Sequence, residues 1–84
     1  MTKDKGVILV AAQKQAEKQK LLSPSTRWFP PEQVELVRVP DKTVGWVVGK
    51  DCETLRIVLV LDTNRVHLFD QDEIVLIANE EAVV

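Results

Sequence analysis

The sequence has no long hydrophobic run and almost no cysteine. Its longest apolar stretch, residues 7–12, has six members, whereas a helix that crosses a bilayer needs about 20 apolar residues. That stretch is also shorter than the core of a signal peptide, and Gln13 and Lys14 follow it where a cleavage site would have small residues. Cys52 is the single cysteine, so no internal disulfide can form. We therefore expect no membrane span, no secretion signal and a reducing, cytoplasmic location.

The residues that catalysis and metal binding require are also scarce. His67 is the only histidine, and it is separated in sequence from Cys52 with no third group to orient a Cys–His pair. These two residues and the scattered carboxylates give none of the paired spacings of zinc or calcium sites. The three glycines stand apart, so no glycine-rich phosphate loop is present. The sequence predicts no enzymatic activity, no cofactor and no metal site, and it indicates that Asp70, Asp72 and Glu73 form an acidic turn capping a short 3₁₀ segment.

The overall composition is that of a small globular protein. The chain has 84 residues, of which 45% are hydrophobic and 29% charged, a balance typical of one folded domain. Local composition divides it into three parts. Residues 1–22 are predicted to be helical, residues 23–32 form a proline-rich linker that contains Trp28 and Phe29, and residues 33–84 form a β-rich domain with a short C-terminal tail.

The N-terminal segment favours a helix over residues 4–22. Residues 11–22 have high or adequate helix propensity, and Ile8, Ala12 and Ala16 form an apolar stripe at helical spacing. Residues 7–10 are also compatible with a strand, because β-branched residues in a short run favour extended backbone. Pro24 is expected to end the helix, since it disfavours helical backbone at the preceding residue.

The second half of the chain has the pattern of a small antiparallel β-structure. Most of the valines and isoleucines fall into short runs separated by turn residues. The connections are too short for a crossover helix, so consecutive strands should pair antiparallel. The five predicted strands are residues 34–39, 44–48, 55–61, 66–69 and 74–78.

Three of these runs follow one another in a recognisable order. Val37-Arg38-Val39-Pro40 ends the first run, Val44-Gly45-Trp46-Val47-Val48 forms a second that contains a glycine, and residues 55–60 form the third. With a brief polar turn before the last run, the pattern over residues 33–78 resembles the SH3-like small barrels of the KOW and Tudor kind. The resemblance implies a mainly β fold: a small five-stranded antiparallel SH3-like barrel preceded by a helix. In two respects the sequence departs from that group: Lys42 and Lys50 each lie beside an aspartate, where nucleic-acid-binding members have basic loops, and no tyrosine is present for a peptide groove.

The third run has apolar residues on both of its faces. Alternation is expected to point the leucines and isoleucine at its odd-numbered positions toward the barrel core and Val58 and Val60 away from it. We expect residues 7–29 to cover part of this second face and another protein to bind the rest, with Trp28 and Phe29 either bordering that site or closing one end of the barrel. The hypothesis is a non-enzymatic adaptor or accessory subunit whose protein-binding residues are Trp28, Phe29, Val58 and Val60.

The distribution of charge supports an alternative. Residues 1–28 carry six cationic and two anionic side chains, whereas residues 29–84 carry five cationic and eleven anionic ones. A KOW-like module could bind nucleic acid or a ribonucleoprotein through Lys14, Lys18, Lys20 and Arg27. The acidic remainder of the chain disfavours this reading, because phosphate contacts need clustered cationic side chains. The SH3-like group also includes barrel subunits of photosynthetic or respiratory complexes, which suggests docking of acidic electron carriers as a further role. The acidic remainder of the chain disfavours this role too, because such carriers would need a basic barrel surface.

Overall fold

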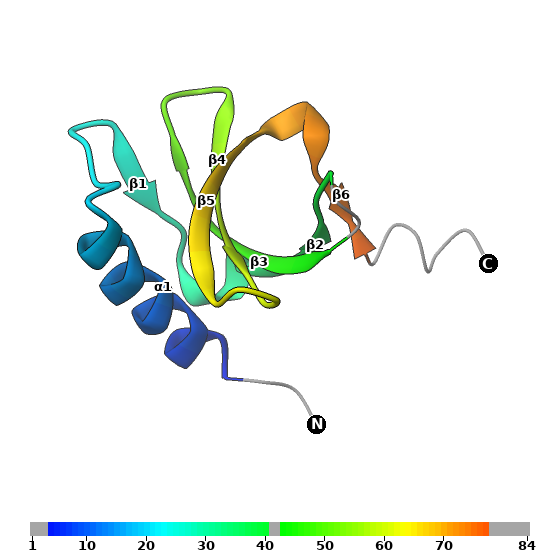
Figure 1. Cartoon of the computed structure of the whole chain (residues 1–84), viewed down its shortest axis with the longest axis horizontal. Helices are drawn as coiled ribbons and strands as arrows, with labels where there is room; N and C mark the ends of the chain where they lie inside the picture. Colours follow the sequence, from blue (N-terminus) through cyan, green and yellow to red (C-terminus); the bar gives the residue numbers. More distant parts are fainter. Residues whose placement is uncertain (1–3, 41–42, 78–84) are drawn as a thin grey trace.

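The computed structural model describes residues 4–40 and 43–77, and it shows one N-terminal helix packed on one antiparallel sheet (Figure 1). This confirms the predicted mainly β class with an N-terminal helix. No helix in the described ranges is long and apolar enough to cross a membrane. The elements in chain order are α1 (Lys5–Gln19), β1 (Thr26–Trp28), η1 (Pro31–Gln33), β2 (Glu35–Arg38), β3 (Val44–Asp51), β4 (Leu55–Val60), β5 (Arg65–Asp70), η2 (Gln71–Glu73) and β6 (Val75–Leu76), where η marks a 3₁₀ turn.

The sheet follows the path β5-β4-β3-β2-β6, and β1 also pairs with β3, beyond the end of β2. Every strand pairing is antiparallel, as predicted from the short connections. The sheet is strongly curved, and α1 lies outside the curve (Figure 1). It therefore has a convex face toward α1 and a concave face enclosed by the strands. The end of the fifth predicted strand, Ala78, and the predicted C-terminal tail lie outside the described residues.

Each face of the sheet carries its own apolar cluster. The convex cluster joins α1 to the sheet, and the concave cluster fills the inside of the curve. The register separates them, because directly opposed residues of antiparallel strands share a face: Ile57 lies opposite Leu68, and Val58 opposite His67. The buried members of the convex cluster are Ile8, Ala12, Ala16, Val34, Val48, Ile57, Leu59 and Val66, and those of the concave cluster are Val37, Val39, Val47, Val58 and Val60.

The prediction that Val58 and Val60 lie on the face away from the core, where a partner could reach them, is wrong. Val58 is fully buried and Val60 is 6% exposed, both in the concave cluster. The two faces of β4 were correctly recognised as apolar, but their roles were exchanged: Ile57 and Leu59, assigned to the barrel core, are the residues that α1 covers. Alternation along a strand separates two faces without showing which face is concave.

The helix α1 begins and ends at defined caps. The side chain of Asp4 accepts a hydrogen bond of 2.9 Å from the backbone N–H of Gly6, which satisfies one of the free N–H groups at the helix start. Lys20 has a left-handed backbone with φ of 59° and closes the C-terminus, so the helix stops before the predicted end at Leu22. Residues 7–10, which were also compatible with a strand, are helical.

The predicted apolar stripe of α1 is confirmed, and its alanines have a specific effect. Ala12 and Ala16 are almost completely buried against the sheet, and their small side chains allow the helix backbone to come close to the strands. Gln19 then fixes the last turn of the helix. Its side-chain amide donates to Val66 O at 2.8 Å, and its carbonyl oxygen accepts from Val66 N at 2.9 Å. This pairing covers part of the exposed edge of β5.

The segment predicted as a linker contains a strand. Residues Thr26–Trp28 pair with Asp51–Gly49, so β3 continues through a region that was predicted to be a turn. Gly49 makes this approach possible, because a Cβ atom there would lie 2.5 Å from the carbonyl oxygen of Arg27. The acidic 3₁₀ segment, in contrast, is confirmed: the Asp70 side chain caps η2, and the Glu73 carboxylate accepts a hydrogen bond from the Asp70 N–H.

We predict that Gly49→Ala lowers the free energy of unfolding by about 1–3 kcal/mol, because the added methyl group meets backbone atoms that cannot move independently. Gly6→Ala is the control, since its added Cβ meets only the Asp4 side chain, at 3.2 Å, and alanine favours the helix. Urea unfolding measures both variants. Equal stability of the wild type and Gly49→Ala would show that β1 does not depend on this close approach.

Candidate functional site

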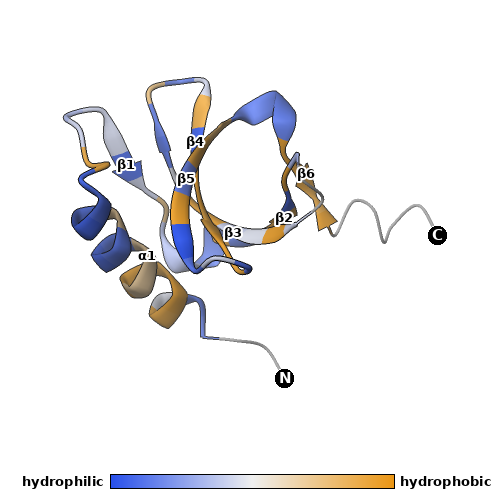
Figure 2. Ribbon diagram, viewed as in Figure 1, coloured by the Kyte–Doolittle hydropathy of each residue, from blue (hydrophilic) through white to orange (hydrophobic). Residues whose placement is uncertain are grey.

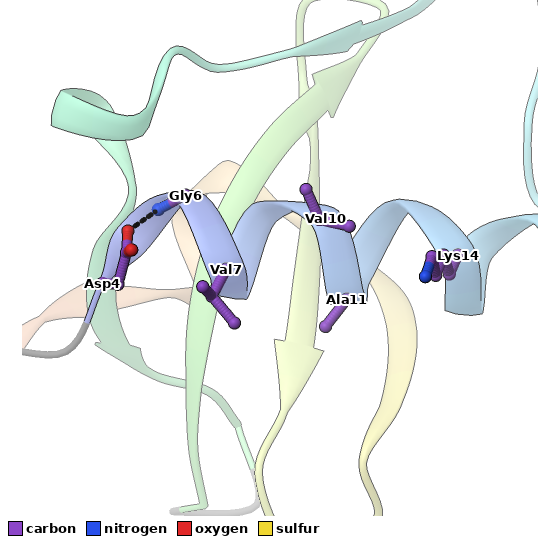
Figure 3. Close-up of a pocket in the computed structure, with 6 residues that line it drawn as sticks. All are labelled: Asp4, Gly6, Val7, Val10, Ala11 and Lys14. Carbon is purple, nitrogen blue, oxygen red and sulfur yellow. Dashed lines mark hydrogen bonds between the residues drawn. The ribbon is translucent and has the colours of Figure 1, made fainter.

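The side of α1 that faces away from the sheet carries an exposed apolar patch. Val7 is 64% exposed and Val10 is 49% exposed. They border a shallow hollow of about 470 Å³ (Figure 3). The residues lining this hollow are Asp4, Gly6, Val7, Val10, Ala11 and Lys14.

The patch continues toward the helix C-terminus as a basic surface. Val7, Ala11, Lys14 and Lys18 follow one another at spacings of three or four residues, which place them on one side of an α-helix. Lys14 and Lys18 are both exposed. Figure 2 shows the change along the helix, from a hydrophobic N-terminal half to a hydrophilic C-terminal half. We call the surface formed by Val7, Val10, Ala11, Lys14 and Lys18 the outer face of α1.

The four predicted nucleic-acid-binding residues do not form one cluster on this face. Lys14 and Lys18 lie one turn apart on the outer face, whereas Lys20 is the C-cap of the helix. Arg27 is on β1, where its guanidinium donates to the carbonyl oxygens of Pro24 at 3.0 Å and Thr26 at 2.9 Å. Glu17 is exposed between the helical lysines and reduces their local positive charge.

The two predicted aromatic anchors face opposite sides of the sheet. Trp28 packs against the convex cluster and Phe29 against the concave cluster, and both are half-buried. The backbone N–H of Phe29 also donates to Val48 O at 2.9 Å. The pair therefore supports both apolar clusters, and neither side chain stands free in solvent.

A second hollow opens at the concave side, near the turn between β4 and β5. It has a volume of about 350 Å³, an apolar part and a polar rim that includes Asp62 and His67. The rings of His67 and Phe69 lie 6.1 Å apart between centroids, at an interplanar angle of 44°. The residues lining this hollow are Val39, Thr43, Val60, Asp62, Thr63, His67 and Phe69.

His67 and Cys52 lie apart along the β4–β5 pair. Cys52 belongs to the turn before β4, next to the Leu55–Asp70 end of the ladder, whereas His67 lies opposite Val58. Three residues along a strand separate these positions, which is about 10 Å. Of the residues that the structure describes, no group of three or more His, Cys, Asp or Glu could hold a metal ion.

The Cys52 thiol has an altered acidity. Hydrogen bonding from the backbone of Thr54, and then of Leu55, lowers the pKa of this exposed thiol, because it stabilises the thiolate. The Asp51 carboxylate acts in the opposite direction. Cys52 adopts a left-handed backbone with φ of 52° in the tight turn that presents these N–H groups.

The outer face of α1 was not identified as a site from the sequence. The sequence contains a pattern that could have predicted it, because Val7, Val10 and Ala11 lie at helical positions away from Ile8, Ala12 and Ala16. This pattern indicates a second apolar helix face only if residues 7–10 are helical rather than extended.

Comparison with known proteins adds no assignment. No family model matches the chain, no curated protein matches its sequence, and no solved structure matches its fold.

We predict that folded Cys52 is alkylated at lower pH than the same cysteine in the urea-unfolded chain. The lowered pKa gives more thiolate at any pH below the ordinary range, and the thiolate is the reacting form. The rate of iodoacetamide modification as a function of pH measures both midpoints. A folded-state midpoint equal to or above that of the unfolded chain would show that the turn does not stabilise the thiolate.

Proposed function

We propose that this protein is a non-enzymatic interaction module that binds another protein through the outer face of α1, in a cytoplasmic setting as the single cysteine suggests. The observation that carries the proposal is the exposure of Val7 and Val10 on a helix whose opposite side is already buried. The inner stripe holds the helix on the sheet, so the outer valines are not needed for folding and remain available for a partner.

The size of the patch sets the strength of the contact that it supports. Removing a half-exposed valine from water contributes about 1 kcal/mol, so Val7 and Val10 together contribute about 2 kcal/mol. This is consistent with a transient contact or with one part of a larger interface. Val58 and Val60 have no part in the proposed surface, because both are buried inside the chain.

We also propose that the sheet belongs to the SH3-like group of small barrels. The support is the order β5-β4-β3-β2-β6 together with the brief polar turn, here η2, before the last strand. Proteins of this architecture serve many functions, so the resemblance alone assigns none. The role proposed for this chain depends on α1, which precedes the part of the chain that carries the resemblance.

Binding of nucleic acid receives less support than binding of protein. Only Lys14 and Lys18 of the four candidate residues share the outer face, and Glu17 lies between them in sequence. The exposed valines add nothing to phosphate binding, which depends on the number of cationic contacts.

We predict that partner proteins captured from native extract by the wild-type chain are lost with Val7→Asp/Val10→Asp. The two carboxylates oppose burial of the patch, and we expect capture to fall about tenfold or more. Leu61→Asp is the matched control, because Leu61 is 48% exposed in the turn after β4. Quantitative mass spectrometry measures capture, with and without nuclease.

Three outcomes of this experiment are distinct. Loss with the α1 variant and retention with Leu61→Asp support the outer face as the binding surface. Equal retention with both variants contradicts the proposal. Loss of all capture after nuclease treatment would instead favour the nucleic-acid alternative. Circular dichroism verifies that each variant remains folded.

A further inference from the structure

We infer that the occupant of the outer face of α1 is an acidic amphipathic helix of a partner protein, which lies antiparallel to α1. This inference rests on the proposed function and specifies the partner's chemistry. Three features of the outer face support it: the positions of its charges, the direction of the helix and the small residues beside its valines.

Among the residues that the structure describes, the two lysines of the outer face have no ion-pair partner. Neither Lys14 nor Lys18 forms an ion pair with a described residue, although both are exposed and one turn apart. In contrast, Lys50, which is on the sheet, has Glu53 within 3.9 Å. A partner with two carboxylates one helical turn apart would match the two free ammonium groups.

The direction of the partner follows from the polarity of α1. On the outer face, the apolar residues lie in the N-terminal part of α1, and Lys14 and Lys18 lie in its C-terminal part. Acidic side chains are most favourable in the first turns of a helix, where they complement the helix dipole. Only an antiparallel partner places its own first turns beside Lys14 and Lys18. The partner sequence should therefore begin with acidic residues and continue with apolar ones.

The shallow hollow beside the valines offers an apolar surface that a large apolar side chain can cover. Gly6 and Ala11 are the smallest residues that line it, and Val7 and Val10 border it (Figure 3). A leucine or methionine at helical spacing after the acidic residues would lie between these two valines. An amphipathic helix binds an apolar surface through anchors at this spacing.

A second copy of the chain fits the outer face less well. An antiparallel pair of α1 helices centred on Val10 and Ala11 would place Lys14 of each copy against the partner copy's Val7, where the ammonium group loses water without gaining a carboxylate. A parallel pair would oppose lysine to lysine. Both arrangements leave the Lys14 charge uncompensated.

The test uses two synthetic helical peptides and the full chain. The acidic peptide has two glutamates one turn apart in its N-terminal half and two leucines one turn apart in its C-terminal half. The basic peptide replaces both glutamates by lysine. Each peptide is titrated at low ionic strength into three proteins: the wild type, Lys14→Glu/Lys18→Glu and Val7→Asp/Val10→Asp. NMR shifts of the α1 amides measure binding.

We expect the wild type to bind the acidic peptide about tenfold more tightly than the basic one, and the doubly reversed variant to invert this preference. Val7→Asp/Val10→Asp should weaken both interactions. A peptide with the leucines placed before the glutamates should bind the wild type more weakly, because it cannot match apolar and charged halves in the antiparallel direction.

Each contrary result has a separate meaning. Equal affinity for both peptides, lost in the valine variant, would overturn the acidic partner but leave the outer face as a binding surface. Affinity that is unchanged in the valine variant would contradict both the inference and the proposed function. Dimers of the chain alone in sedimentation, abolished by Val7→Asp/Val10→Asp, would identify a second copy as the occupant and overturn the inference.

Discussion

The structure depends on covering the convex face of the sheet. Ile57, Leu59 and Val66 form an apolar surface that the concave cluster cannot enclose, and the inner stripe of α1 is what removes it from water. The stripe covers the convex face well because two of its residues are small. Ala12 and Ala16 bury little area of their own, but they bring the whole helix close enough for Ile8 and the strands to exclude water. The Gln19–Val66 pairing then fixes the helix along the edge strand.

The inner side of α1 is buried against the sheet, so the outer side is not needed to hold the helix in place. This outer side carries exposed apolar residues, which an ordinary solvated helix surface lacks. Val7 and Val10 are exposed beside a hollow, and Lys14 and Lys18 extend the same face toward the C-terminus. Because α1 is held on the sheet, its outer face already has a fixed conformation. Binding of a partner therefore carries no entropic cost of ordering the helix. The proposed binding role thus follows from the same packing that stabilises the fold.

Much of the architecture could be predicted from the sequence, and the failures have physical causes. Helical spacing identified the stripe Ile8, Ala12 and Ala16, and the turn residues separated the strands of the sheet. The strand β1 was missed because its pairing depends on the close approach at Gly49, which no local pattern shows. The faces of β4 were exchanged because alternation is the same for either curvature of the sheet. The outer face of α1 was missed because β-branched residues at positions 7–10 also favour a strand.

The most direct test of this account is native-state hydrogen exchange of the α1 amides in the isolated protein. If α1 is an integral layer of the fold, the amides of Ala12 and Ala16 and the Gln19-bound amide of Val66 should exchange only through global unfolding, with the same opening free energy as the β4 amides. Fast exchange of the α1 amides alongside slow exchange of β4 would show that the helix separates from an otherwise stable sheet. In that case the convex face of the sheet would become exposed when the helix separates, and it would replace the outer face of α1 as the candidate binding surface.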